Sequence, residues 1–239
     1  MSYAIETNGL TKEFIVYRKT TVAINDVNLL IKEGELFGII GANGAGKTTL
    51  IKILCCLILP TKGTACVHGY DILQNEEQVK SCIGLVSGEE RSFYWRLTGR
   101  QNLQFFASLY NISASKAKER IKYLLDLLEI REPDRRYQEY STGIKQRLAI
   151  AKSLLNDPKV LFIDEPTKSL DPETAQRVRA FIKNKIARQQ NITVFFATHN
   201  LEEAEYLADH LALIDKGEIK VFGTMEEVGK NILTCFSAS

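Results

Sequence analysis

Residues 41–49 read Gly-Ala-Asn-Gly-Ala-Gly-Lys-Thr-Thr, a spacing that suits a loop wrapped around phosphate groups. Glycines let backbone N–H groups turn inward, and the following lysine and threonine add a cation and a hydroxyl ligand for Mg²⁺. Apolar runs at 36–40 and 50–58 predict the strand before this loop and the helix after it. A helix that starts near Gly46 would point its positive end at the same phosphates. The segment therefore predicts nucleotide binding, with an ordinary glycine-rich turn as the alternative.

Each residue type in this loop predicts a contact. Lys47 would neutralise the outer phosphates, and Thr48 would bind Mg²⁺ through its hydroxyl. Contacts to the nucleotide are expected from Gly41, Asn43, Gly44, Ala45, Gly46, Lys47, Thr48 and Thr49.

An apolar run at 160–163 ends in two carboxylates, Asp164 and Glu165. In a parallel sheet, ligands gather at the carboxyl ends of the strands, where the phosphate-binding loop also lies. Asp164 is expected to hold Mg²⁺ directly or through water, and Glu165 to polarise an attacking water. The alternative is a strand that ends in a solvated acidic turn.

Residues 140–147, Tyr-Ser-Thr-Gly-Ile-Lys-Gln-Arg, predict the capped start of an amphipathic helix, with Ser141 and Gly143 ahead of it. A helix N-terminus is an anion site. Since every helix has one, these residues alone do not decide whether it is used.

The elements that must position these residues alternate along the chain. Strand-type runs occur at 3–7, 22–31, 35–40, 64–68, 160–163, 193–197 and 211–214. From about 89 to 157 the pattern is helical, and a further helix is predicted at 173–190. The alternation predicts an α/β fold in which helices cover both sides of a parallel sheet.

Within the helical middle, residues 115–130 form the most regular pattern, with Ser113 or Ser115 as its N-cap. The apolar positions at spacings of three and four are Ile121, Leu124, Leu125 and Leu128. We expect this middle part to be an insertion into one domain.

The composition suits one large α/β domain or two small ones and argues against nucleic acid as a partner. With 239 residues and 45% hydrophobic content, the chain can bury an α/β core. Its 31 basic and 29 acidic residues give a net charge of +2, which argues against nucleic-acid binding. The longest apolar run, 53–60, is far shorter than the ~20 residues of a membrane span. Five scattered cysteines suit reduced cytosolic thiols.

Five motifs follow one another in the order 41–49, Ser141-Thr-Gly143 with Lys145-Gln-Arg147, Ile163-Asp-Glu-Pro-Thr167, Ser169-Leu-Asp171, and Thr198-His199. Together, and over essentially the whole chain, they resemble the nucleotide-binding subunit of ATP-binding cassette (ABC) transporters. The resemblance implies an ATPase that uses ATP and Mg²⁺. The implied fold is a P-loop NTPase core, a parallel sheet flanked by helices, with an N-terminal antiparallel β subdomain and an inserted helical subdomain. A single domain would cover 1–239, with the core at 1–88 and 158–239 and the helical subdomain at about 89–157.

By the same resemblance, Ser141, Thr142 and Gly143 belong to the family signature, which touches the γ-phosphate. Thr142 stands where glycine is commoner. In this family two cassettes face each other head to tail, so that each ATP lies between the phosphate loop of one and the signature of the other. A second nucleotide-binding subunit, expected to be another copy of this chain, is therefore implied. Residues 169–171 would cross the dimer seam, with Lys168 where a small residue is more usual.

The resemblance also suggests roles for His199 and Phe14. His199 would hydrogen-bond the γ-phosphate and align the water with Glu165, which makes Glu165 and His199 the expected catalytic pair. A buried structural histidine is the alternative. Residues 10–14 resemble the segment whose aromatic ring stacks on adenine, so Phe14 is the first candidate and Tyr17 the second. The alternative for either ring is a place in the core.

The hinge between core and helical subdomain departs from the family, which usually has a glutamine there that touches Mg²⁺. Residues 83–90 contain none, and counting back from 97–103 places Glu89 at that position, with Gly88 and Glu90 as alternatives. A carboxylate would still bind Mg²⁺. Its negative charge beside the phosphates predicts slower hydrolysis or a stronger dependence on the partner.

These observations predict an ATP-hydrolysing subunit at the cytoplasmic face of the membrane, which powers a separate transmembrane permease. Residues 97–103, the Ser-Thr-Gly signature and the short C-terminus resemble bacterial export cassettes. The alternative is a soluble ABC-type ATPase in translation or DNA repair, a class that usually has two cassettes or a long coiled-coil insertion. Aromatic residues at 93–95 and 105–106 suit either packing or docking of a short helix from a membrane subunit. The transported substrate does not follow from the sequence.

Overall fold

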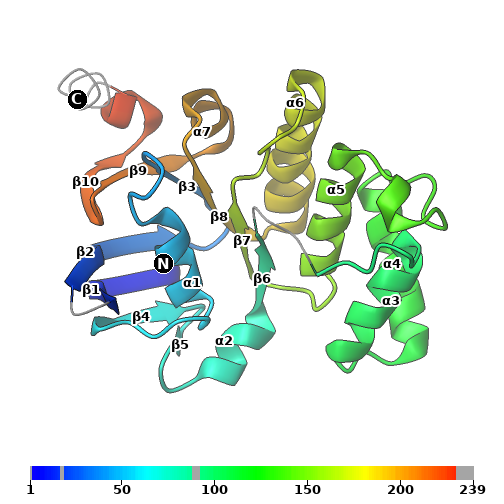
Figure 1. The fold of residues 1–239 in the computed structure, drawn as a ribbon, viewed down its shortest axis with the longest axis horizontal. Coiled ribbons are helices and arrows are strands. Elements are labelled where there is room, and N and C mark those ends of the chain that lie inside the picture. Colours follow the sequence, from blue (N-terminus) through cyan, green and yellow to red (C-terminus); the bar gives the residue numbers. More distant parts are fainter. Residues whose placement is uncertain (1, 17–18, 88–91, 230–239) are drawn as a thin grey trace.

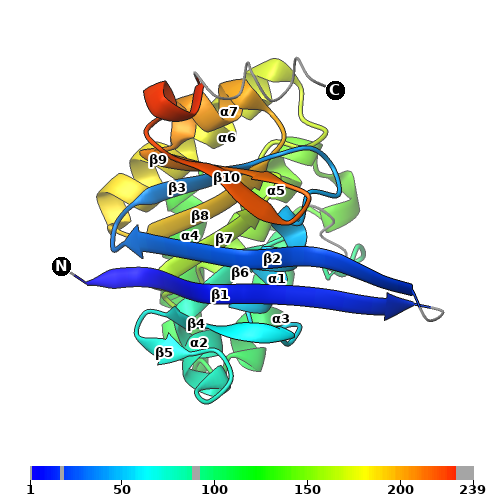
Figure 2. The ribbon, with the colours of Figure 1, turned by 90° about the vertical axis from the view of Figure 1, so that its left-hand side faces the viewer.

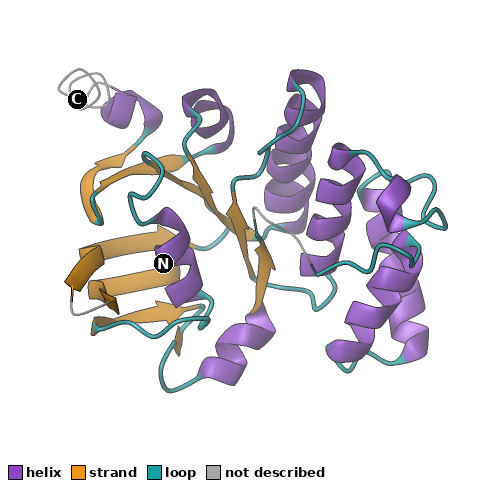
Figure 3. Ribbon diagram, in the orientation of Figure 1, coloured by secondary structure: helices purple, strands orange, loops and turns teal. Residues whose placement is uncertain are grey.

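The computed structural model of the chain describes residues 2–16, 19–87 and 92–229. A smaller and a larger sheet lie beside each other, and most of the helices lie on the side of the larger sheet that faces away from the smaller one (Figures 1 and 3). The predicted α/β fold, with a parallel sheet and an N-terminal antiparallel sheet, is confirmed.

The larger sheet has the strand order β10-β9-β3-β8-β7-β6. All neighbouring strands in it pair in parallel except β10, which pairs antiparallel with β9. Every residue of β3 and β8 is buried, as expected for strands covered on both faces. Helices cover one face, whereas the helix at 47–54 and the smaller sheet cover the other, so the prediction of helices alone on both sides is only partly met. The strands are β3 (Leu36–Ile40), β6 (Ile83–Val86), β7 (Val160–Asp164), β8 (Thr193–Thr198), β9 (His210–Asp215) and β10 (Glu218–Gly223).

The smaller sheet is antiparallel and has the order β2-β1-β4-β5 (Figure 2). Its strands are β1 (Tyr3–Val16), β2 (Lys19–Lys32), β4 (Lys62–Val67) and β5 (Tyr70–Asp71). β1 continues well beyond the strand predicted at 3–7, because it pairs with β2 from Tyr3 to Val16 through several register shifts.

Helix α1 (Lys47–Leu54) packs between the two sheets, as Figure 1 shows. A single core cluster joins its Leu50 to Ile5 of the smaller sheet and to Phe37 and Phe162 of the larger one. The first residue of this helix is also the lysine of the predicted phosphate loop. Packing against both sheets therefore fixes where the loop lies.

The helical region comprises α3 (Gly99–Leu109), α4 (Ala114–Leu127), the short 3₁₀ turn η1 (Tyr137–Glu139) and α5 (Thr142–Ser153). The helix predicted at 115–130 is present as α4, and Ser113 holds its N-cap position without a side-chain capping bond. Leu124 of α4 and Leu148 of α5 belong to the same core cluster as Leu161 and Phe196 of the larger sheet. The helical region thus shares its core with the sheet, and the boundaries at about 89 and 157 stay a prediction.

The fold also contains α2 (Glu76–Cys82), α6 (Pro172–Ala180), α7 (Leu201–Leu207) and a helical turn at 225–229. α6 continues directly into a π-helical stretch, η2 (Phe181–Gln189), so the helix predicted at 173–190 is present but changes its hydrogen bonding half-way. Among the described residues, none of the helices is both long enough and apolar enough to cross a membrane.

Asn102, fully buried on α3, secures the chain that enters the helical region. Its amide nitrogen donates to the carbonyl groups of Tyr94 and Thr98 at 3.0 Å, and its Oδ1 accepts from the Tyr94 N–H at 2.8 Å. Asn102→Ala leaves these partly buried backbone groups without their side-chain partner, which predicts a loss of about 1–3 kcal/mol in the free energy of unfolding. Chemical denaturation measures this loss. The exposed Gln104→Ala on the same helix is the control, and equal losses in both variants would contradict the expectation.

Candidate functional site

A cavity of about 500 Å³ opens at the carboxyl ends of β3 and β7, where the phosphate loop begins. It brings together residues from the predicted loop, the acidic pair and three further lysine or serine positions. Its lining residues are Ala23, Asn43, Gly44, Gly46, Lys47, Thr48, Thr49, Lys52, Ser87, Asp164, Glu165 and Lys168. The cavity is therefore where the sequence places the nucleotide phosphates.

The loop has the backbone shape that its glycines predict. Gly44 and Gly46 have φ values of 81° and 113°, a region that side-chain-bearing residues rarely adopt. A Cβ on Gly46 would also lie 2.4 Å from the carbonyl oxygen of Ala23. Gly46 is the N-cap of α1, so the loop delivers the positive end of this helix to the cavity.

Lys47 is 6% exposed, and its ammonium group is held inside the loop. Its Nζ donates to the carbonyl oxygens of Gly41 at 2.7 Å and Ala42 at 2.9 Å. Burial lowers the pKa of Lys47, while the nearby charges of Glu165 and Asp164 raise it. These contacts hold a cation at the rim of the cavity, opposite the carboxylates.

Thr48 and Asp164 form the oxygen-rich side of the cavity. The Thr48 hydroxyl donates to Asp164 Oδ2 at 2.8 Å, whereas the buried Oδ1 has no hydrogen-bond partner among the residues that the structure describes. Burial raises the pKa of Asp164, and the hydrogen bond from Thr48 and the charges of Lys47 and Lys168 act in the opposite direction. A carboxylate oxygen without a partner, next to a hydroxyl, is a donor set that fits Mg²⁺.

Glu165 and His199 meet at the neighbouring strand ends. His199 Nδ1 lies 2.8 Å from Glu165 Oε1, with 14% of the Glu165 side chain exposed and 53% of the His199 side chain. Glu165 has a φ of 58°, and its N–H donates to the carbonyl oxygen of Ala197 on β8 at 2.8 Å. This left-handed conformation is costly for a residue with a side chain, and such strain is concentrated at functional sites.

The predicted signature lies away from this cavity. Ser141 caps α5, and its hydroxyl accepts from the N–H of Ile144. Gly143 packs against α6, since a Cβ there would lie 2.3 Å from Thr174 Cγ2. Among the described residues that line the cavity, none comes from 141–143, so neither Ser141, Thr142 nor Gly143 reaches the phosphate loop of its own chain.

Phe14 is not among the described residues that line the cavity. It is on β1 opposite Thr21, 37% exposed, with Lys12 Nζ 5.0 Å from its ring centre. The stacking role of Phe14 stays a prediction, and the second candidate, Tyr17, lies outside the described residues. Glu89 and its alternatives, Gly88 and Glu90, also lie outside them.

Sequence reasoning did not assign three polar lining residues: Lys52, Ser87 and Lys168. Lys52 lies four residues after Thr48 in α1 and so shares its face, a signal that helical spacing contains. Ser87 follows β6, whose carboxyl end lies at the same sheet edge as that of β7. Lys168 was recognisable only as an unusual residue for its motif.

The family now follows from comparison with known proteins. The sequence profile of the family described as "ABC transporter" matches residues 24–168. The chain belongs to this family. It is 36% identical over 225 residues to the ABC transporter ATP-binding protein NatA of Bacillus subtilis (strain 168), covering 94% of this chain and 91% of NatA. It is 38% identical over 235 residues to the daunorubicin/doxorubicin resistance ATP-binding protein DrrA of Streptomyces peucetius, covering 96% of this chain and 69% of DrrA.

The fold agrees with this assignment. A solved structure described as the dimeric structure of MJ0796, a bacterial ABC transporter cassette, has a TM-score of 0.81 and 26% sequence identity. The similarity covers 92% of this chain and 98% of that one. The chain is thus an ATP-binding subunit of the ABC transporter family and an ATPase.

Lys168 adds a positive charge to the ABC cassette's phosphate cavity. We expect Lys168→Ala to weaken ATP binding in EDTA about two- to fivefold, the size of an exposed charge interaction. Isothermal titration calorimetry measures the affinity. Lys185→Ala, an exposed lysine on η2, is the control. If both variants change the affinity equally, Lys168 does not act on the phosphates.

Proposed function

We propose that this ABC cassette works as a dimer that encloses ATP between two copies and drives export through a separate membrane permease. One observation carries the dimer: the cavity contains the phosphate loop, Asp164 and Glu165, while the signature segment 141–143 lies elsewhere on the same chain. A signature from a second copy would complete the site. The dimeric state described for the similar MJ0796 cassette supports this arrangement.

The residues in and beside the cavity would have different roles in hydrolysis. Lys47 is placed to leave its loop carbonyls and bind the outer phosphates. The Thr48 hydroxyl and Asp164 would hold Mg²⁺, which neutralises charge on the phosphates when bound. Glu165 is placed to accept a proton from the attacking water, and His199 to hydrogen-bond the γ-phosphate while it orients Glu165.

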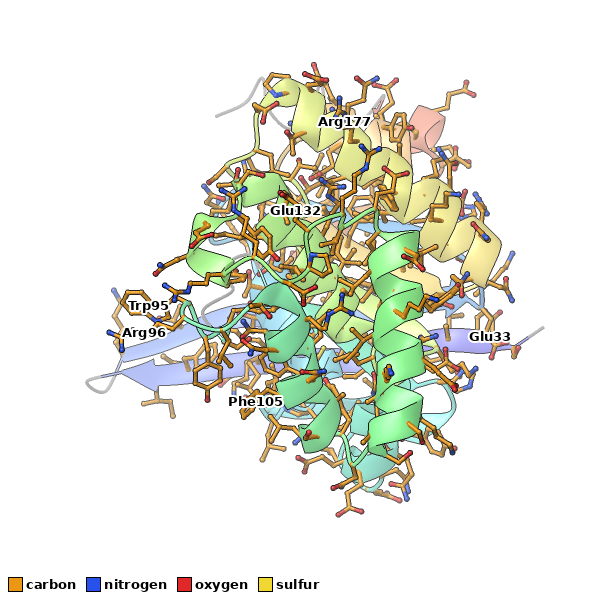
Figure 4. All side chains as sticks on the ribbon, turned by 90° about the vertical axis from the view of Figure 1, so that its right-hand side faces the viewer. Glu33, Trp95, Arg96, Phe105, Glu132 and Arg177 are labelled. Carbon is orange, nitrogen blue, oxygen red and sulfur yellow. The ribbon has the colours of Figure 1, made fainter. Side chains whose placement is uncertain are left out.

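The helical region offers a surface to the proposed permease. Phe93 and Phe106 are buried at 5% and 9% exposure, which assigns them to packing. Trp95 is 72% exposed, and Figure 4 shows Trp95 and Arg96 at the outer edge of this region, with Phe105 on α3. Exposed aromatic side chains of this kind are typical contact residues. We propose that they contact the permease at the cytoplasmic face of the membrane.

The direction of transport is proposed from similarity. DrrA is described as an ATP-binding protein of daunorubicin and doxorubicin resistance, and expelling a drug is one way to resist it. Residues 97–103 and the Ser-Thr-Gly signature also resemble export cassettes. Export is therefore the direction that we propose.

Glu165→Gln tests the ATP-enclosing dimer. The variant should retain ATP binding and lose hydrolysis, because an amide does not accept the proton from water. A homodimer should then accumulate in the presence of ATP, and size-exclusion chromatography with light scattering detects it. A variant that stays monomeric at saturating ATP and Mg²⁺ would contradict the homodimer, and one that still hydrolyses ATP would contradict the role of Glu165.

Lys47→Ala tests the assignment of the cavity. Removing the cation that faces the transferred phosphoryl group should lower the rate of ATP hydrolysis at least about a hundredfold. Lys185→Ala is again the matched control, since it removes an exposed lysine at a distance from the loop. Near-normal hydrolysis by Lys47→Ala would show that the cavity is not the hydrolytic site.

A further inference from the structure

Glu203 is a buried carboxylate to which neither ATP binding nor hydrolysis has so far been assigned. It lies on α7, which packs on β3, β8 and α6, and only 1% of it is exposed. The Thr167 hydroxyl donates to Glu203 Oε1 at 2.6 Å, and the Thr198 side chain lies close enough to the same carboxylate to lower its pKa. Thr198 is fully buried, and its Oγ1 accepts from the Asn200 N–H at 3.0 Å.

The two threonines belong to the two turns that carry the proposed catalytic pair. Thr167 lies two residues after Glu165, and Thr198 directly precedes His199. The Glu203 carboxylate is therefore hydrogen-bonded to the chain that leaves β7 and lies beside the chain that leaves β8. The two strands are already paired in the sheet. The contact with Glu203 adds a connection beyond the ends of the strands, where their backbone hydrogen bonds end.

A buried carboxylate is an expensive way to fill this space. Burial raises the pKa of Glu203, and the neighbouring charge of Glu165 raises it further, while Thr167, Thr198 and Arg179 lower it. A well-packed apolar side chain would avoid this desolvation. An apolar side chain could not accept the hydrogen bond from the Thr167 hydroxyl, so this polar contact beside Thr198 is the property that distinguishes Glu203.

The first of these turns is held from the opposite side as well. Gln146 Nε2, on α5, donates to the carbonyl oxygen of Pro166 at 2.9 Å. The chain between Glu165 and Thr167 is thus fixed between α5 and α7. The turn after β8 is joined to α7, because Asn200 is the N-cap of this helix and its Oδ1 accepts from the N–H of Glu203 at 3.1 Å.

We propose that Glu203 is a positioning residue, which sets the distance between Glu165 and His199 by holding Thr167 in place beside Thr198. The proposal rests on the catalytic roles proposed for Glu165 and His199. It assigns no contact between Glu203 and the nucleotide, since Glu203 does not line the phosphate cavity among the described residues. Its loss should therefore change turnover rather than ATP affinity.

The main test compares Glu203→Ala with Glu203→Gln and with Glu202→Gln, an exposed neighbour on the same helix. We expect Glu203→Ala to lower kcat about ten- to a hundredfold, as displacement of catalytic groups does, with KM for ATP changed less than about twofold. Glu203→Gln keeps one oxygen acceptor and should recover a large part of the rate. Glu202→Gln should match the unchanged chain.

Removing Glu203 from a buried site also carries a risk of unfolding, so the hydroxyl partners provide a second test. Thr167→Val deletes the donor at similar volume, and Thr167→Ser keeps it. The valine variant should lose turnover as Glu203→Ala does, whereas the serine variant should not. Hydrogen–deuterium exchange without nucleotide should show faster exchange at 165–170 and 198–200 in Thr167→Val, with α4 unchanged.

The outcomes separate this proposal from the function on which it rests. Equal kcat losses in Thr167→Val and Thr167→Ser, or a loss in Glu203→Ala that appears in KM alone, would overturn the positioning role. Unchanged exchange at both turns would overturn it as well, whatever the ATPase rate. Continued hydrolysis by Glu165→Gln would instead overturn the catalytic assignment, and it would do so without any Glu203 variant.

Discussion

The hydrogen bond between Thr48 and Asp164 is the contact on which the arrangement of the site depends. Asp164 ends a strand whose preceding residues are fully buried, so its carboxylate needs compensation from nearby groups. Thr48 supplies a hydroxyl and Lys47 a positive charge, and both come from the first turn of α1. The helix therefore has to pack directly against β7, and the glycine loop has to close the short distance from β3 to its first turn.

The parts of the fold that the sequence predicts are those buried on both faces. Strands β3, β7 and β8 leave continuous apolar runs because neither face meets water. β6 and β10 were not predicted from the sequence, for different reasons. Gly84 interrupts β6, where α5 approaches so closely that a Cβ would lie 2.3 Å from the Ser153 carbonyl oxygen. β10 is a partly exposed edge strand, whose residues give no clear apolar pattern.

Motif spacing predicted Lys47, Thr48, Asp164 and Glu165, which line the cavity, and His199, which lies beside Glu165, because each is close to a predicted strand end or loop; their roles stay predictions. Lys168 and Ser87 reach the cavity only through the turn after β7 and the end of β6, so the fold has to be known first. The contacts of the signature segment 141–143 cannot be read from one chain. The separation of this segment from the cavity is a property of one chain, and the contact that the family resemblance implies needs a second chain.

The surroundings of Lys47 affect the strength of anion binding. Its ammonium group is already ligated by two carbonyl oxygens of its own loop. An arriving phosphate would therefore meet the third N–H donor of the ammonium group and would have to replace the loop carbonyls to gain the other two, so part of the new bonding would be offset by the bonds lost. The loop carbonyls act as an internal competitor. A small anion with a single charge would replace few of these bonds. A polyphosphate that also bound the α1 N-terminus and the neighbouring lysines would gain more, so the loop would favour ligands that make several contacts.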